Sequence, residues 1–185
     1  MPGALSGSVR HYVLALVLAF CGLPLQSATL ERLTFADMAV KSTLVVRGKV
    51  LSSSAAFTGG LIFTHYRVQV TEPLKGHSAG VIDVAVPGGV ANGILQAVSG
   101  APEFQPGDDY VFFLWTSRAG ITQVIGLTQG LFQVTGSGAD PALARHPSHE
   151  LMLDAHTHRP VKDAALTMRL SELRTAIANA LGAGQ

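Results

Sequence analysis

The sequence predicts a mainly β protein of the α+β class. Its strands are expected to form a small antiparallel β-barrel or sandwich, with a short N-terminal helix and a C-terminal amphipathic helix. One observation is the alternation of apolar and polar side chains from Leu61 to Glu72, which is typical of a strand with one buried face. The other is a stripe of leucine and isoleucine at three- and four-residue steps near the C-terminus, which is typical of a helix.

We expect six strands, at residues 44–51, 61–72, 81–86, 110–115, 121–125 and 131–135. In the second strand, the side chains expected to face the core are Ile62, Tyr66, Val68 and Val70. The run from Tyr110 to Trp115 is apolar throughout, which predicts a central strand covered on both faces. Residues 52–60 are expected to form a loop, and residues 87–107 a long irregular stretch rich in glycine and proline.

Two helices are expected. Thr34 can cap a short helix at 34–41, because Asp37 stands three residues later as in a capping box. Asp163 can cap a longer helix at 163–181, whose apolar stripe is Leu166, Leu170, Leu173, Ile177 and Leu181. Since a lone helix of this length is only marginally stable, we expect it to dock on the barrel. The alternative is that its stripe pairs with another molecule.

The first 28 residues predict an exported protein. Arg10 precedes an apolar run from Tyr12 to Cys21, which Pro24 and the small residues around Ala28 follow. This order is typical of a secretory signal peptide, and the run is too short to span a membrane. Cleavage would leave residues 29–185 as one β-rich domain, periplasmic or extracellular, with a core at 44–135 and a histidine-rich loop at 136–160. The alternatives are a lipid anchor on Cys21 and an uncleaved N-terminal helix.

Composition excludes several classes of function for the mature chain. Cys21, the only cysteine, lies in the signal, so the mature chain has neither disulfide nor thiol chemistry. Without Arg10 the basic and acidic side chains are equal in number, which argues against nucleic acid or an anionic membrane as a partner. After the signal, no apolar run is long enough to cross a bilayer.

The histidine-rich loop is the candidate metal site. Its possible ligands are His146, His149, His156 and His158, with Glu150 and Asp154 nearby. Zinc or copper accepts such donors, and His156 and His158 would share a face on an extended segment. The spacing matches no known zinc motif, so the alternative is an exposed polar loop that contains histidines.

No pattern predicts catalysis, so we expect a non-enzymatic protein. Gly88, Gly89 and Gly93 are not followed by the lysine and hydroxyl residue of a phosphate loop. Ser99 lacks the glycine that precedes a nucleophile by two residues in a nucleophile elbow, and the adjacent Asp108 and Asp109 would point to opposite faces of a strand. A basic stripe of Arg47, Lys49, His65 and Arg67 is expected on a solvated face or, as the alternative, at a ligand site.

The long irregular stretch is the candidate surface for a protein or envelope ligand. Its apolar residues Val90, Ile94, Leu95, Val98 and Phe104 are expected to be partly exposed. The alternative is that they cover the open end of the barrel. We therefore expect an exported binding or interaction module. The alternative function is a metal-binding or metal-dependent protein that uses the histidine-rich segment 146–158.

The order of short motifs resembles a known family. Val46-Arg47-Gly48-Lys49-Val50 is followed by Val68-Gln69-Val70, Leu74-Lys75-Gly76, Phe104, Gly107 and Tyr110 to Leu114. This order, over residues 44–115, resembles the netrin-like, OB-type domain of tissue inhibitors of metalloproteinases. The resemblance implies an OB-like five-stranded barrel with a flanking helix. It does not extend to inhibition, which needs an N-terminal cysteine. The chain also looks like an uncharacterised family of exported bacterial proteins, which implies no activity.

Overall fold

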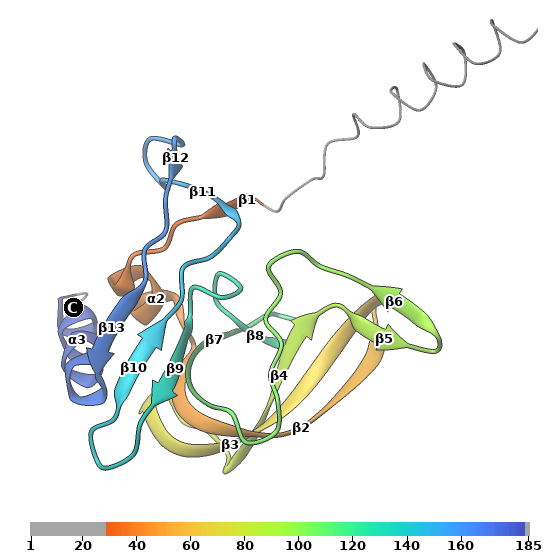
Figure 1. Ribbon diagram of the computed structural model, residues 1–185, viewed down its shortest axis with the longest axis horizontal. Coiled ribbons are helices and arrows are strands. Elements are labelled where there is room, and N and C mark those ends of the chain that lie inside the picture. Colours follow the sequence, from red (N-terminus) through yellow and green to blue (C-terminus); the bar gives the residue numbers. More distant parts are fainter. Residues whose placement is uncertain (1–28, 184–185) are drawn as a thin grey trace, which may run out of the picture.

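The computed structural model describes residues 29–183, so the predicted signal peptide lies outside the described residues (Figure 1). The strands are β1 (Thr29–Glu31), β2 (Leu44–Thr58), β3 (Leu61–Lys75), β4 (Val81–Pro87), β5 (Gly89–Ala91), β6 (Ile94–Gln96), β7 (Asp109–Thr116), β8 (Thr122–Val124), β9 (Leu131–Thr135), β10 (Ala142–Arg145), β11 (Leu151–Leu153), β12 (Pro160–Val161) and β13 (Leu166–Arg169). The helices are α2 (Phe35–Lys41) and α3 (Leu170–Gly182). The prediction of a mainly β protein with antiparallel strands and two helices is confirmed.

The largest sheet has the strand order β13-β10-β9-β7-β2-β3-β4, and β8 pairs with β7. The sheet curls until β4 lies beside β8, yet within residues 29–183 no ladder joins these two strands, so the barrel is not closed. A separate small sheet contains a parallel pair, β1 with β11, where only antiparallel pairs were expected.

Strand β7 is the central strand that its apolar run predicts. It pairs with β2, β8 and β9, and its residues Val111 to Leu114 are fully buried. Trp115, which was expected to be covered as well, is 38% exposed near the end of the strand. Because side chains alternate along a strand, Val111 and Phe113 lie on one face of the sheet, and Phe112 and Leu114 lie on the other. The sheet therefore has a separate hydrophobic cluster on each face.

The β2–β3 hairpin corrects one sequence prediction. Residues 52–58, expected to be a loop, continue β2, and Ser52 to Ser54 pair with Arg67 to His65. The turn is Gly59-Gly60, with φ of 60° and 87°, as the tight turns of antiparallel hairpins require. Residues 87–107 are likewise not wholly irregular, because β5 and β6 form a short hairpin within them.

Helix α2 begins as predicted, with reciprocal hydrogen bonds between Thr34 and Asp37. Helix α3 begins at Leu170 instead of Asp163, because residues 166–169 form strand β13 and pair with β10. The predicted docking of this helix is confirmed: Leu170, Leu173 and Ile177 are buried against α2 and one face of the sheet. No helix in residues 29–183 is long and apolar enough to cross a membrane.

Candidate functional site: an apolar end without charged groups

Two stretches of the chain contain no charged or titratable side chain: residues 50–64 and residues 84–102 have no Asp, Glu, Lys, Arg or His. The fold brings these stretches together, because the β5–β6 hairpin packs beside the far ends of β2 and β3. Figure 1 shows this hairpin, in light green, at the end of the molecule opposite α2 and α3. The two chain segments that meet at this end therefore contribute no charged side chain to it.

Large apolar side chains are exposed at this end. We call the following five residues the apolar end: Phe57, Leu61, Val90, Ile94 and Leu95, which are 44%, 54%, 61%, 55% and 72% exposed. They make up half of the ten large hydrophobic side chains that are exposed in residues 29–183. Scattered exposed hydrophobic residues are ordinary, whereas a cluster of them is typical of an interaction surface.

The base of the β5–β6 hairpin is fixed to β3. Thr64 Oγ1 donates a hydrogen bond to the carbonyl of Gly88 (2.8 Å), and the Gly88 N–H donates to the carbonyl of Ile62 (2.8 Å). The Ile62 N–H in turn donates to Gln96 Oε1 (3.1 Å). Gly89 has φ +128° and lies so close to Thr64 that a side chain would collide with Oγ1. The hairpin is thus held as part of the scaffold.

The tip of the hairpin presents a fixed pair of apolar side chains. Asn92 and Gly93 both have positive φ (51° and 76°), which is the conformation of a tight hairpin turn. Val90 and Leu95 are directly paired across the two strands, so their side chains stand on one face. A surface that is ordered before binding loses less conformational entropy when it binds.

A cleft of about 260 Å³ lies beside the hairpin, between its strands, the ends of β3 and β4, and residues 97–103. Val90 and Leu95 form one wall, and Val98, Ala101 and Pro102 form another. Glu103 is the one charged side chain that lines this cleft among the described residues, and it is exposed. The cleft and the apolar end therefore adjoin each other, because Val90 and Leu95 belong to both.

The five residues predicted to bind a partner differ in how exposed they are. Val90, Ile94 and Leu95 are exposed, and Val98 is half-buried in the wall of the cleft. Phe104 is buried, in edge-on contact with Tyr66, Tyr110 and Phe112. The expectation of partial exposure is therefore wrong for Phe104, which covers the inner face of the curled sheet.

The four histidines predicted to bind metal are all exposed and lie in two different loops. His146 and His149 are in the connection between β10 and β11, whereas His156 and His158 are in the turn between β11 and β12. His158 has φ +53°, so this segment is a turn instead of the extended chain that would place both side chains on one face. Within residues 29–183, no group of three or more His, Cys, Asp or Glu side chains is arranged to hold a metal ion.

The two carboxylates near these histidines have structural partners. Asp154 Oδ1 accepts hydrogen bonds from the backbone N–H groups of Thr157 (2.8 Å) and His156 (3.1 Å), and these bonds lower the pKa of Asp154. Glu150 Oε1 accepts a hydrogen bond from Ser99 Oγ (2.7 Å). Both carboxylates therefore stabilise the local chain, and Ser99 is bonded to an acid instead of a histidine base.

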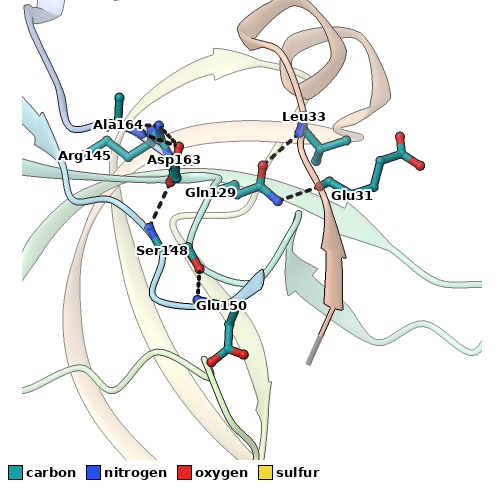
Figure 2. A network of polar contacts seen from close by, with 8 residues as sticks. All are labelled: Glu31, Leu33, Gln129, Arg145, Ser148, Glu150, Asp163 and Ala164. Atoms are coloured by element: carbon teal, nitrogen blue, oxygen red, sulfur yellow. Dashed lines mark hydrogen bonds and ion pairs between the residues drawn. The ribbon is translucent and has the colours of Figure 1, made fainter. Parts of the chain in front are cut away.

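A polar network holds the histidine-rich loop and the N-terminal strand on the body of the protein (Figure 2). Asp163 accepts two hydrogen bonds from the Arg145 guanidinium, both 2.8 Å, and one from the Ser148 N–H (2.9 Å). Burial alone would raise the pKa of Asp163, but these hydrogen bonds outweigh it and lower the pKa. Asp163 thus anchors this loop instead of capping α3.

Gln129 is the second part of this network (Figure 2). It is almost fully buried, accepts a hydrogen bond from the Leu33 N–H (2.8 Å) and donates one to the carbonyl of Glu31 (2.9 Å). A buried amide with both ends satisfied orders the chain that passes it. Gln129 therefore fixes the path of the chain directly after β1.

Two of the four residues in the predicted basic stripe have acidic partners. Arg47 forms an ion pair of 2.7 Å with Asp109, and the hydrogen bond to that carboxylate raises the pKa of Arg47. His65 Nδ1 lies 2.7 Å from Asp83 on the outer face of the sheet. Lys49 and Arg67, the other two residues of the stripe, are exposed.

The sequence feature that could have located the apolar end is the absence of charge in two separate stretches. It becomes informative only when the fold places these stretches side by side.

Comparisons of the chain with protein-family models, with curated proteins and with solved structures found no match.

Proposed function

We propose that this protein is an exported, non-enzymatic binding module that acts through the apolar end and the adjoining cleft. The observation that carries the proposal is the exposure of five large apolar side chains on two neighbouring uncharged segments, residues 50–64 and 84–102: Phe57, Leu61, Val90, Ile94 and Leu95. Binding surfaces commonly consist of loops that a rigid scaffold holds in place.

Burial of the apolar end would contribute a substantial part of the free energy of binding. Burial of a large apolar side chain contributes about 1.5–3 kcal/mol, and these five are roughly half-exposed, so their burial would contribute about 4–8 kcal/mol. Association costs about 4–15 kcal/mol in lost translational and rotational freedom, and the ordered hairpin reduces only the further cost of ordering the chain. A tightly held partner would therefore contact the adjoining cleft as well as the apolar end.

The predicted export is part of this proposal. Cleavage after Ala28 would make Thr29 the first residue of the mature protein, and Thr29 is also the first residue of β1. Processing at this position would therefore leave every strand and helix described above intact. The binding partner would then be found in the cell envelope or outside the cell.

The OB-like resemblance also remains a proposal, and the strand pairing supports it. Strands β2, β3 and β4 form a meander, β7 returns beside β2, and β8 pairs with β7 and lies beside β4. An OB-fold is a five-stranded, partly open barrel, which is compatible with the gap between β4 and β8. Helices α2 and α3 would flank this barrel on its outer face.

The test is fractionation of the full chain, produced in its native cells, with and without changes at the apolar end. We expect wild-type protein to be recovered in a complex or with envelope membranes, and the double variant Val90→Ser/Leu95→Ser to be recovered as a free monomer. The matched control is Val40→Ser/Leu151→Ser, which changes two side chains that are 52% and 47% exposed elsewhere. A free wild-type monomer, or equal release of the control variant, would contradict the proposal.

A further inference from the structure

We infer that the apolar end binds the surface of a lipid bilayer by shallow insertion of the two hairpin tips. This inference rests on the proposed function, because it names the occupant of the same surface. The two tips are the β2–β3 turn, with Phe57 and Leu61, and the β5–β6 hairpin, with Val90, Ile94 and Leu95.

Absence of charge is the first argument. A charged side chain is costly at the centre of a bilayer, about 2.5–3.5 kcal/mol on insertion scales. The stretches 50–64 and 84–102 contain no such side chain, although charged residues make up 14% of the whole sequence. Two separate segments that both avoid charge, and that meet at one end of the fold, match the chemistry of a lipid surface.

The kind of apolar residue is the second argument. Energetic hot spots of protein–protein interfaces are enriched in tryptophan, tyrosine and arginine, whereas leucine and valine are under-represented there. The apolar end contains no tryptophan, tyrosine or arginine and consists of phenylalanine, leucine, isoleucine and valine. On the insertion scale, these four residue types are the ones that favour the bilayer.

The backbone at the tips is the third argument. Unpaired N–H and C=O groups cannot enter a bilayer without a large loss of free energy. Both tips are two-residue turns closing antiparallel hairpins, so the flanking strands are paired along their inner edges. Among the described residues no ladder pairs the outer edges of β5 and β6, so only the turns and the side chains beside them are expected to enter the bilayer, which keeps insertion shallow. Side chains of Thr58 and Asn92 stand at the turns and can hydrogen-bond to lipid headgroups.

These features distinguish the expected mode of binding from electrostatic attachment. Basic proteins bind anionic membranes through lysine and arginine, and salt weakens that attraction. The apolar end has no basic residue, so its binding is expected to require neither anionic lipid nor low salt. Insertion to about 5–10 Å would leave the rest of the sheet, with its ion pairs, in water.

The experiment is flotation of the mature chain with phosphatidylcholine vesicles that contain no protein. We expect wild-type protein to float with the vesicles equally well at low and high salt, and with or without anionic lipid. Val90→Ser/Leu95→Ser is expected to lower the partition coefficient by about tenfold or more, because two apolar side chains leave the contact. Val40→Ser/Leu151→Ser is expected to bind like wild type.

A second variant reports insertion directly and does not depend on loss of binding. Leu95 is 72% exposed, so Leu95→Trp is expected to fold normally and to place an indole at the tip. Its fluorescence should shift to shorter wavelength with vesicles and be quenched by lipids brominated in the acyl chain. An unshifted spectrum would overturn the inference.

Other outcomes separate the inference from the proposed function. Wild-type protein could fail to bind the vesicles but stay in the envelope fraction, from which Val90→Ser/Leu95→Ser releases it. In that case the partner is a protein, and the inference fails while the proposed function holds. A concentration-dependent dimer that the same variant abolishes, without vesicle binding, would show that a second copy covers this end. Binding lost at high salt would also overturn the inference.

Discussion

Removal of the Asp163 carboxylate is expected to destabilise the protein strongly. The Asp163 side chain is only 3% exposed, and its partner Arg145 is 12% exposed. Loss of one partner from a buried ion pair costs about 3–5 kcal/mol, because the other charge is left buried without compensation. We therefore expect Asp163→Ala to lower the free energy of unfolding by this amount, and the melting temperature by about 10 °C for a domain of this size.

The same pair predicts how stability depends on pH. Because folding lowers the pKa of Asp163, its contribution is present above the pKa of the unfolded chain, about 3.9, and is lost as pH falls through the lower pKa of the folded protein. The difference in stability between wild type and Asp163→Asn should therefore be constant near neutral pH and shrink below about pH 4. Urea denaturation followed by circular dichroism over this pH range measures it.

A matched control is Asp83→Asn. The Asp83 side chain is 57% exposed beside His65, so its removal should change the free energy of unfolding by less than about 1 kcal/mol. If Asp163→Ala costs no more than this control, or if its effect is unchanged from pH 7 to pH 3, the account of the Arg145–Asp163 pair is refuted.

Three further predictions concern the core, the N-terminal strand and export. Phe112→Ala should cost about 3–5 kcal/mol by urea denaturation, because Phe112 is fully buried in the central strand; a loss under about 1 kcal/mol would contradict this. Gln129→Ala should cost about 1–3 kcal/mol and speed hydrogen exchange at the Leu33 amide, which loses its partner; unchanged exchange there would count against the role of Gln129. Mass spectrometry of exported protein should find Thr29 at the N-terminus, and an intact or lipidated N-terminus would exclude cleavage after Ala28.

The fold was predictable from the sequence where local chemistry decides the structure. Continuous apolar residues located β7, alternation located the buried face of β3, and the Thr34–Asp37 pair located the start of α2. In each case the pattern that predicts the element lies within the residues that form it. Patterns of this kind need no knowledge of distant partners.

Prediction failed where a distant partner decides the structure. Ser52 to Ser54 belong to β2 because β3 pairs with their backbone, which their side chains do not reveal. Leu166 fits the apolar stripe of α3 by spacing, but its pairing with Arg145 places it in β13. For long-range pairing of this kind, tertiary contacts override local propensity.

The candidate site was predictable only in part, for the same reason. The apolar character of residues 87–107 was visible, yet the outward direction of Leu95 depends on how the hairpin is fixed to β3. The burial of Phe104 depends on its contacts with Tyr66 and Tyr110. The contribution of Phe57 and Leu61 was not visible, because the turn that joins their strands is distant in sequence from β5 and β6. Clustering of histidines in sequence, conversely, did not become clustering in space.

The most direct test of the central claim, that the apolar end is the binding surface, is a hydrogen–deuterium exchange footprint. A chain that begins at Thr29 would be compared alone and in the presence of envelope membranes from its native cells. Slower exchange is predicted in residues 57–61 and 89–96, with the rest of the described chain unchanged. Protection centred on the histidine-rich loop at 146–158, or no protection at the two hairpin tips, would contradict the account.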